Sequence, residues 1–224
     1  MVGLSSVSVS SMVAGLSYDV LWSAHFSGNR AAIVRQTGVV FSQMTVEIEQ
    51  HRIKGARFLP SPNCNARPED EISLLVIHNI SLPPGQFGGG HIAELFTNRL
   101  DPSGHPFFAE IEGLEVSAHL LIERDGRMTQ FVPFDRRAWH AGRSCFQGRE
   151  ACNDFSIGIE LEGTDDCPYT DAQYECLVAV TQALMTTYPQ LGPETITGHS
   201  DIAPGRKTDP GPAFDWARFL AALG

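Results

Sequence analysis

The sequence has no excess of basic residues. Its 16 Lys and Arg stand against 26 Asp and Glu, which gives a formal net charge of -10 and a sequence pI near 5.2. Nucleic-acid binding needs a basic face that neutralises phosphates, and docking on an anionic membrane needs clustered cations. The charge balance therefore argues against both kinds of partner.

Long apolar runs and export signals are also missing. No apolar stretch approaches the ~20 residues of a membrane-spanning helix. Residues 1–12 are rich in serine and contain no basic residue, whereas a secretory signal begins with positive charge and continues with an unbroken apolar core. We therefore expect a cytoplasmic protein with no membrane partner.

Paired cysteines are absent as well. The five cysteines are an odd number, and none forms a C-x-x-C pair, so a zinc site built from cysteines is disfavoured. We expect all five to be reduced thiols, as is usual in the cytosol, although the sequence leaves a Cys145–Cys152 disulfide open. The five are Cys64, Cys145, Cys152, Cys167 and Cys176.

A length of 224 residues suits one domain with an additional segment. We predict an N-terminal extension over residues 1–43, which either lacks stable order or results from a start codon assigned too far upstream. Residues 44–224 then form a single domain, which is long enough to bury a full core.

Strand-like and helical patterns alternate along residues 44–224. Asp125-Gly126 separates two β-rich runs and predicts a hairpin, and Pro189 ends the longest helical pattern. We expect strands at 72–77, 114–122, 128–132 and 155–162, and helices at 92–96, 171–188 and 214–220. This order predicts an α/β fold, a single domain with a central mixed β-sheet flanked by helices.

Charged side chains are concentrated in residues 197–212, where three prolines and three glycines predict an ordered loop without regular structure. His199 and Asp209 lie ten positions apart, so such a loop can direct both side chains to one metal ion. A third ligand must come from elsewhere, and His78, at the end of a buried apolar strand, is the best donor. Two imidazoles and one carboxylate suit zinc.

Two carboxylates share the polar face of the strand at 155–162. Glu160 and Glu162 alternate with apolar residues, and either one can reach a site at the end of a neighbouring strand. A carboxylate beside an activated water can accept its proton and pass it to a leaving amine. The spacing alone does not choose between the two.

Three segments resemble a known family. They are residues 75–85, which contain Ile77-His78-Asn79; residues 153–165, which contain Ile159-Glu160-Leu161-Glu162-Gly163; and residues 197–215. In this order they resemble the AmpD-type enzymes of the zinc-dependent N-acetylmuramoyl-L-alanine amidase family, which is similar to peptidoglycan-recognition proteins. The resemblance extends from about residue 44 to the C-terminus and does not reach residues 1–43.

The resemblance implies a zinc hydrolase with defined roles for five residues. His78, His199 and Asp209 would hold one Zn²⁺ ion, Glu160 would transfer the proton, and Lys207 would stabilise the oxyanion. The substrate would be a small anhydro-muropeptide, cut at the amide between the lactyl group of N-acetylmuramic acid and L-alanine during peptidoglycan recycling. We expect the enzyme to be a monomer.

Substrate contacts are predicted at three further positions. Asn79 follows His78 as in the family, Trp139 offers an indole face for a sugar, and Arg206 offers a guanidinium for peptide carboxylates. Arg124 and Arg149 are alternatives for that last role.

Two histidines and two other functions stay open. His119 is a rival metal ligand, although we expect it to pack or to line the cleft, and His140 is expected in the substrate wall beside Trp139. One alternative function is an exported amidase that acts on intact peptidoglycan. The other is a peptidoglycan-recognition module that binds without cutting, which the complete set of metal and catalytic residues disfavours.

Overall fold

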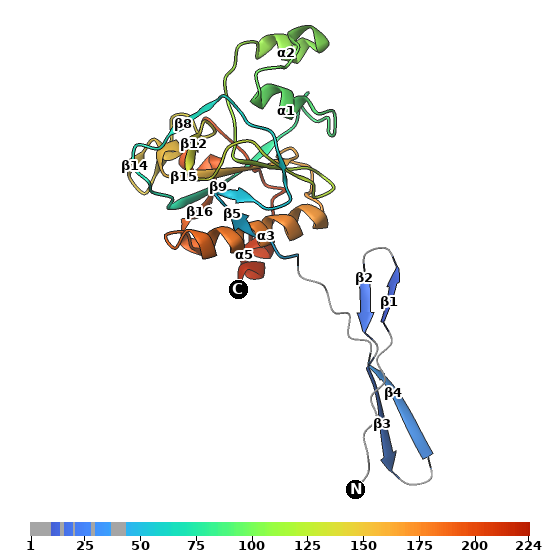
Figure 1. Ribbon diagram of the computed structural model, residues 1–224. Coiled ribbons are helices and arrows are strands. Elements are labelled where there is room, and N and C mark those ends of the chain that lie inside the picture. Colours follow the sequence, from blue (N-terminus) through green and yellow to red (C-terminus); the bar gives the residue numbers. More distant parts are fainter. Residues whose placement is uncertain (1–9, 14–15, 20, 28–29, 37–43) are drawn as a thin grey trace. The chain divides into compact units, whose positions relative to one another are not determined.

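The computed structural model describes residues 10–13, 16–19, 21–27, 30–36 and 44–224, and its contacts divide the chain into two units, Met1–Met44 and Thr45–Gly224. In the first unit β1 (Ser10–Val13) pairs with β2 (Leu16–Asp19), and β3 (Leu21–Ser27) pairs with β4 (Arg30–Gln36), each pair antiparallel (Figure 1). Our prediction for residues 1–43 falls partly outside the described residues and stays a prediction.

The second unit is built on a six-stranded mixed sheet with the order β16-β9-β15-β10-β11-β7. The first four strands run parallel, β11 is antiparallel to β10, and β7 is parallel to β11. The predicted fold class and hairpin are thus confirmed. In sheet order the strands are Ile196–Gly198, Leu74–Ile80, Ser156–Glu162, Leu120–Ile122, Met128–Gln130 and Arg57–Phe58.

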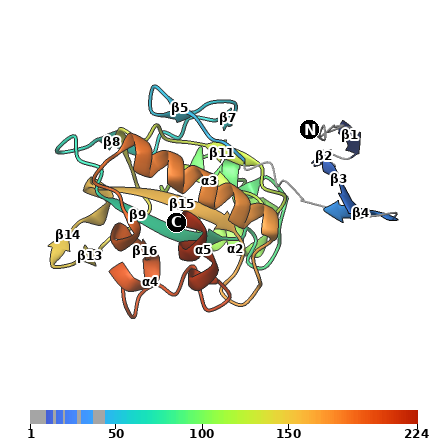
Figure 2. The same cartoon turned by 90° about the horizontal axis from the view of Figure 1, so that it is seen from below.

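The neighbouring interior strands β9 and β15 are covered on both faces. The continuous apolar run of β9 predicts this, whereas the alternating pattern of β15 predicted a polar face. Leu75 and Ile77 face the larger core, which is closed by α3 (Asp171–Thr187) and α5 (Trp216–Leu223). Figure 2 shows these two helices across one face of the sheet. Leu74 and Val76 face the opposite side, where they pack with Ala141 and Ile202. His78 continues that second face.

The helices begin and end close to their predicted positions. In α3 the Thr170 hydroxyl accepts the Gln173 N–H and the Gln173 side chain reciprocates, which is a capping box. In α5 the Asp215 carboxylate caps the Arg218 N–H, so the helix starts after the predicted residue 214 and continues to Leu223. The helix α1 (His91–Phe96) matches the prediction at 92–96.

Short elements complete this unit. They are the strands β5 (Ile48–Glu49), β6 (Arg52–Ile53), β8 (Cys64–Ala66), β12 (Arg136–Ala138), β13 (Cys145–Phe146) and β14 (Arg149–Glu150), the helices α2 (Pro106–Glu110) and α4 (His199–Ile202), and the 3-10 turns at Pro102–Gly104, Cys152–Asp154 and Pro193–Thr195. The prediction of an irregular loop throughout 197–212 was wrong at its start, where β16 ends and α4 follows.

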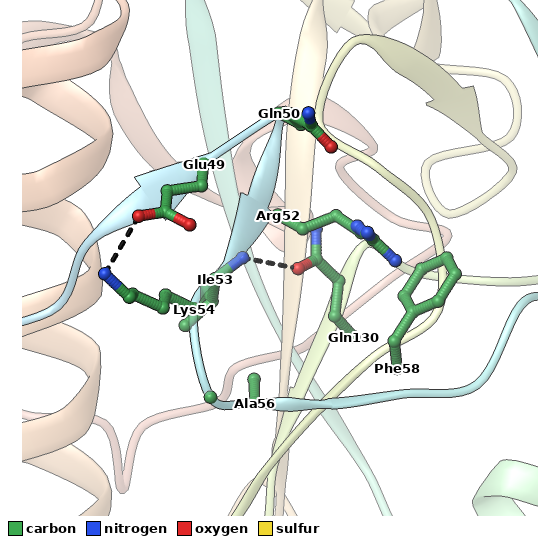
Figure 3. Close-up of a pocket in the computed structure, with 9 residues that line it drawn as sticks. Glu49, Gln50, Arg52, Ile53, Lys54, Ala56, Phe58 and Gln130 are labelled. Atoms are coloured by element: carbon green, nitrogen blue, oxygen red, sulfur yellow. Dashed lines mark hydrogen bonds and ion pairs between the residues drawn. The ribbon is translucent and has the colours of Figure 1, made fainter.

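The hairpin β5–β6 is fastened to the sheet through one side chain. Gln130 accepts the Ile53 N–H through Oε1 at 2.8 Å (Figure 3). Its Nε2 donates to the His51 and Val132 carbonyls. The Gln130 amide is fully used in hydrogen bonds to main-chain groups. We therefore interpret the pocket shown in Figure 3 as the junction between the hairpin and the sheet, and we assign it no ligand.

The five cysteines all lie in the described part of the chain and no disulfide joins them there; that they are reduced thiols stays a prediction. No helix in the described part of the chain is long and apolar enough to cross a membrane.

Candidate metal centre and active site

Three separate segments bring the predicted metal ligands together. His78 lies on β9, and β16 pairs beside it with Gly198 opposite Ile77. His199 follows immediately as the first residue of α4, and the Ser200 N–H donates to the Asp209 carbonyl at 2.9 Å, which returns the loop to the same place. The carboxyl ends of parallel strands are the usual position for a site of this kind.

The three side chains converge on one point. His78 Nδ1, His199 Nδ1 and Asp209 Oδ2 are each 3.0 Å from the other two. Ligand atoms of tetrahedral zinc, bound at ~2.0–2.1 Å, are separated by about 3.3 Å, so the triangle has the size that a zinc ion requires. The side chains are also shielded from water, since His78 is 1 % exposed and Asp209 13 %.

The hydrogen-bond partner of the opposite ring nitrogen indicates which converging atoms present a lone pair. His199 Nε2 faces the Ala141 carbonyl at 3.1 Å, which can only accept, so a neutral His199 carries its proton there and leaves Nδ1 bare. Burial lowers the pKa of His78 to about 4. Burial raises the pKa of Asp209, but the adjacent imidazoles of His199 and His78 outweigh it and keep the pKa below its usual range. A carboxylate and neutral imidazoles are the forms that bind a divalent cation.

The two candidate carboxylates, Glu160 and Glu162, have different surroundings in the structure. Glu162 is a structural residue, since Oε1 accepts the Gly88 N–H at 2.6 Å and Oε2 accepts the Arg124 N–H at 3.2 Å. Glu160 lies opposite His78 in the β15–β9 register. Its Oε2 is one of three buried side-chain polar atoms without a hydrogen-bond partner in the described residues. Burial, followed by the charge of Asp209, raises the pKa of Glu160 well above its usual value. A partnerless buried carboxyl suits proton transfer.

The predicted catalytic lysine lies near this group. Lys207 is exposed, and its positive charge opposes the rise in the pKa of Glu160 and contributes to the low pKa of His78. The sequence therefore places a cation beside the metal ligands without burying it.

The predicted substrate-binding residues also make contacts within the protein. Asn79 Nδ2 donates to Asp165 Oδ1 at 2.8 Å and to the Pro210 carbonyl at 3.1 Å. Trp139 Nε1 donates to Asn65 Oδ1 at 2.7 Å.

The three arginines proposed for peptide carboxylates are similarly engaged. Arg206 Nη2 donates to the Ala141 and Arg143 carbonyls. Arg124 donates to the Pro168 and Glu162 carbonyls. Arg149 pairs with Glu71 at 2.7 Å and lies over the Phe155 ring. These partners could not be predicted from a sequence pattern, because they are main-chain groups or come from distant segments.

Of the two remaining candidate histidines, His119 packs as expected, whereas His140 has contacts that were not predicted. His119 is fully buried, with the Gly158 N–H on Nδ1 at 3.0 Å and the Arg136 carbonyl on Nε2 at 2.9 Å, so it packs and is not a rival ligand. His140 faces His78 and Ser156 through its two ring nitrogens.

Comparisons with known proteins establish the family of the chain. The N-acetylmuramoyl-L-alanine amidase family matches residues 68–212. The chain belongs to the N-acetylmuramoyl-L-alanine amidase family. A curated member, the 1,6-anhydro-N-acetylmuramyl-L-alanine amidase AmpD of Enterobacter cloacae, is 66 % identical over 177 residues, which is 79 % of this chain and 94 % of the relative. The AmpD of Haemophilus influenzae is 55 % identical over 79 % of this chain and 97 % of its own length.

Solved structures of amidases show the same fold. A selenomethionine AmpD crystal structure superposes with a TM-score of 0.77 at 61 % identity, covering 79 % of this chain and 99 % of that one. The solution structure of Citrobacter freundii AmpD gives 0.57 at 63 % identity, covering 76 % and 91 %. The predicted family and enzyme class are therefore confirmed, and the chain is an amidase with a buried His-His-Asp cluster that can hold a metal.

Proposed function

We propose that this amidase uses zinc to hydrolyse the amide between the lactyl group of 1,6-anhydro-N-acetylmuramic acid and L-alanine of the stem peptide, in the cytoplasmic recycling of peptidoglycan. The observation that carries the proposal is the convergence of three lone pairs at 3.0 Å beside a buried carboxyl that has no partner for one oxygen. The high identity to proteins named AmpD supports the substrate.

His78, His199 and Asp209 would hold the zinc ion. When bound, zinc supplies a Lewis acid that polarises the amide carbonyl and makes water acidic near neutral pH. Glu160 accepts the proton of the attacking water and delivers it to the departing amine, a task that suits a carboxyl with a raised pKa. The Lys207 ammonium stabilises the negative charge that develops on the carbonyl oxygen.

We propose separate roles for the predicted substrate residues. Asn65 fixes the Trp139 indole by accepting its N–H, which suits a rigid aromatic wall for the sugar. Asn79 and Arg206 hold main-chain segments next to the metal ligands, and we propose that they contact the muropeptide from these fixed positions. We further propose that the amidase acts as a monomer, since the candidate site is assembled from one chain.

Turnover of anhydro-muramyl-tripeptide, followed by mass spectrometry, tests the function. We expect release of free tripeptide, its loss after chelation of the metal, and its return with one equivalent of zinc. Glu160→Gln should reduce turnover by about 10²–10⁴-fold while zinc stays bound, and the exposed Glu175→Gln is the control. Tight binding of the tripeptide without cleavage, at full zinc occupancy, would instead identify a recognition module.

A further inference from the structure

The loop at residues 138–142 touches both candidate metal histidines. His140 Nδ1 lies 2.9 Å from His78 Nε2, and the carbonyl of the next residue, Ala141, lies 3.1 Å from His199 Nε2. Two consecutive residues therefore face the ring nitrogens that the metal does not use. Outer contacts of this kind set the tautomer and the orientation of a metal-binding imidazole.

The hydrogen-bond directions around His140 follow from the metal site. His78 can present a bare Nδ1 only if its proton is on Nε2, and His140 Nδ1 must then accept that proton's hydrogen bond. A neutral His140 in turn carries its own proton on Nε2, which lies 3.1 Å from Ser156 Oγ, and that serine is fully buried. A single arrangement of protons satisfies the whole row from His78 to Ser156.

Gly158 leaves space for the His140 imidazole. A Cβ atom on Gly158 would lie 2.5 Å from both Cγ and Nδ1 of His140, so no larger residue fits at that point of β15. The loop is also held at its main chain, because Asn153 Oδ1 accepts the His140 N–H at 3.2 Å and the Ala141 N–H at 2.8 Å. The rings of His78 and His140 meet edge to face, with their centroids 5.0 Å apart.

We propose that His140 is a positioning residue of the metal centre. Its Nδ1 accepts the Nε2–H of His78 and so fixes the tautomer and angle at which His78 presents Nδ1 to the metal, while Ser156 fixes His140 in turn. The proposal rests on the proposed zinc site. It assigns His140 no contact with the substrate.

The test compares two substitutions at the same position. His140→Phe fills the space but offers no acceptor, whereas His140→Asn places an amide oxygen close to the position of Nδ1. Zinc release to a chromogenic chelator is measured on the zinc-loaded full chain. We expect release from His140→Phe to be about 10–100-fold faster than from the wild type, and His140→Asn to recover most of the difference.

Two further measurements separate positioning from folding. Nitrogen-15 NMR of histidine-labelled, metal-free protein should show His78 protonated at Nε2 in the wild type and in His140→Asn, and a mixture of tautomers in Ser156→Ala. Thr181→Val is the matched control, since it alters a buried hydroxyl of α3 that has no hydrogen-bond partner in the described residues. It should leave zinc release unchanged.

Equal zinc release from the wild type and His140→Phe would overturn the proposal. Zinc release that is equally accelerated in His140→Phe and His140→Asn would also overturn it, because the effect would then not depend on the hydrogen-bond acceptor. If His140→Phe does not fold, the tautomer of His78 in Ser156→Ala decides, and an unchanged tautomer there refutes the positioning role. A wild-type chain that binds no zinc would refute the proposed function itself, which is a different result.

Discussion

The buried His119 should make the metal-free protein sensitive to acid. Its Nδ1 accepts the Gly158 N–H and its Nε2–H donates to the Arg136 carbonyl, so a second proton has no acceptor. Burial, and then the charge of Arg67, lowers the pKa of His119 to about 3. The other titratable groups that face it are the rings of His78 and His140.

The sign and size of the effect follow from linkage. Unfolded His119 takes up a proton below its usual pKa of ~6.5 and folded His119 does not, so stability is present above pH 6.5 and is lost as the pH falls towards 3. The unfolded and folded pKa values of His119 differ by about 3.5 units, which corresponds to about 5 kcal/mol of stability. About 2 kcal/mol of this free energy of unfolding is lost between pH 7 and pH 5.

Urea unfolding of the metal-free wild type and of His119→Gln, at pH 7, 6 and 5, measures this contribution of His119 to the free energy of unfolding. The variant should be less stable at pH 7, because two buried hydrogen bonds are lost. Its deficit should shrink by about 2 kcal/mol at pH 5, since glutamine does not titrate. His51→Gln, at an exposed histidine, is the control for removal of an imidazole. A deficit that stays constant across the three pH values would refute the reasoning.

Three other substitutions test the surroundings of the site. Gly158→Ala should displace His140 and speed zinc release as His140→Phe does, whereas Gly104→Ala, whose Cβ would lie an ordinary 3.5 Å from Phe108, should not. Glu162→Gln should destabilise the fold by about 1–3 kcal/mol and speed hydrogen exchange at Gly88 with little change in kcat; an unchanged exchange rate would contradict its role as a tether. Lys207→Gln should lower kcat by about 10²–10³-fold with normal zinc binding, and normal kcat would exclude the lysine from catalysis.

Much of the fold was readable because its signals are local. The apolar run before His78 predicted a central strand, and the Asp125-Gly126 turn predicted the β10–β11 hairpin. The hairpin β5–β6 was not predicted. Its turn is made by Gln50 and His51, which adopt positive φ angles of 49° and 62° without the usual glycine or asparagine.

The choice between Glu160 and Glu162 could not be made from the pattern. Both lie on one face of β15, and their difference comes from the N–H groups of Gly88 and Arg124, which belong to other segments. The position of His140 could not be predicted either, because it depends on the space that Gly158 leaves in another segment.

The order of the strands also bears on when a new chain could bind the proposed zinc ion. His78 and Asp209 meet across 131 positions of sequence, and the strand that carries Glu160 must be in place beside β9. During synthesis the third ligand therefore appears only when nearly the whole domain has been made. The proposed zinc ion would therefore bind late, after the sheet that positions its ligands has assembled, and would not nucleate folding.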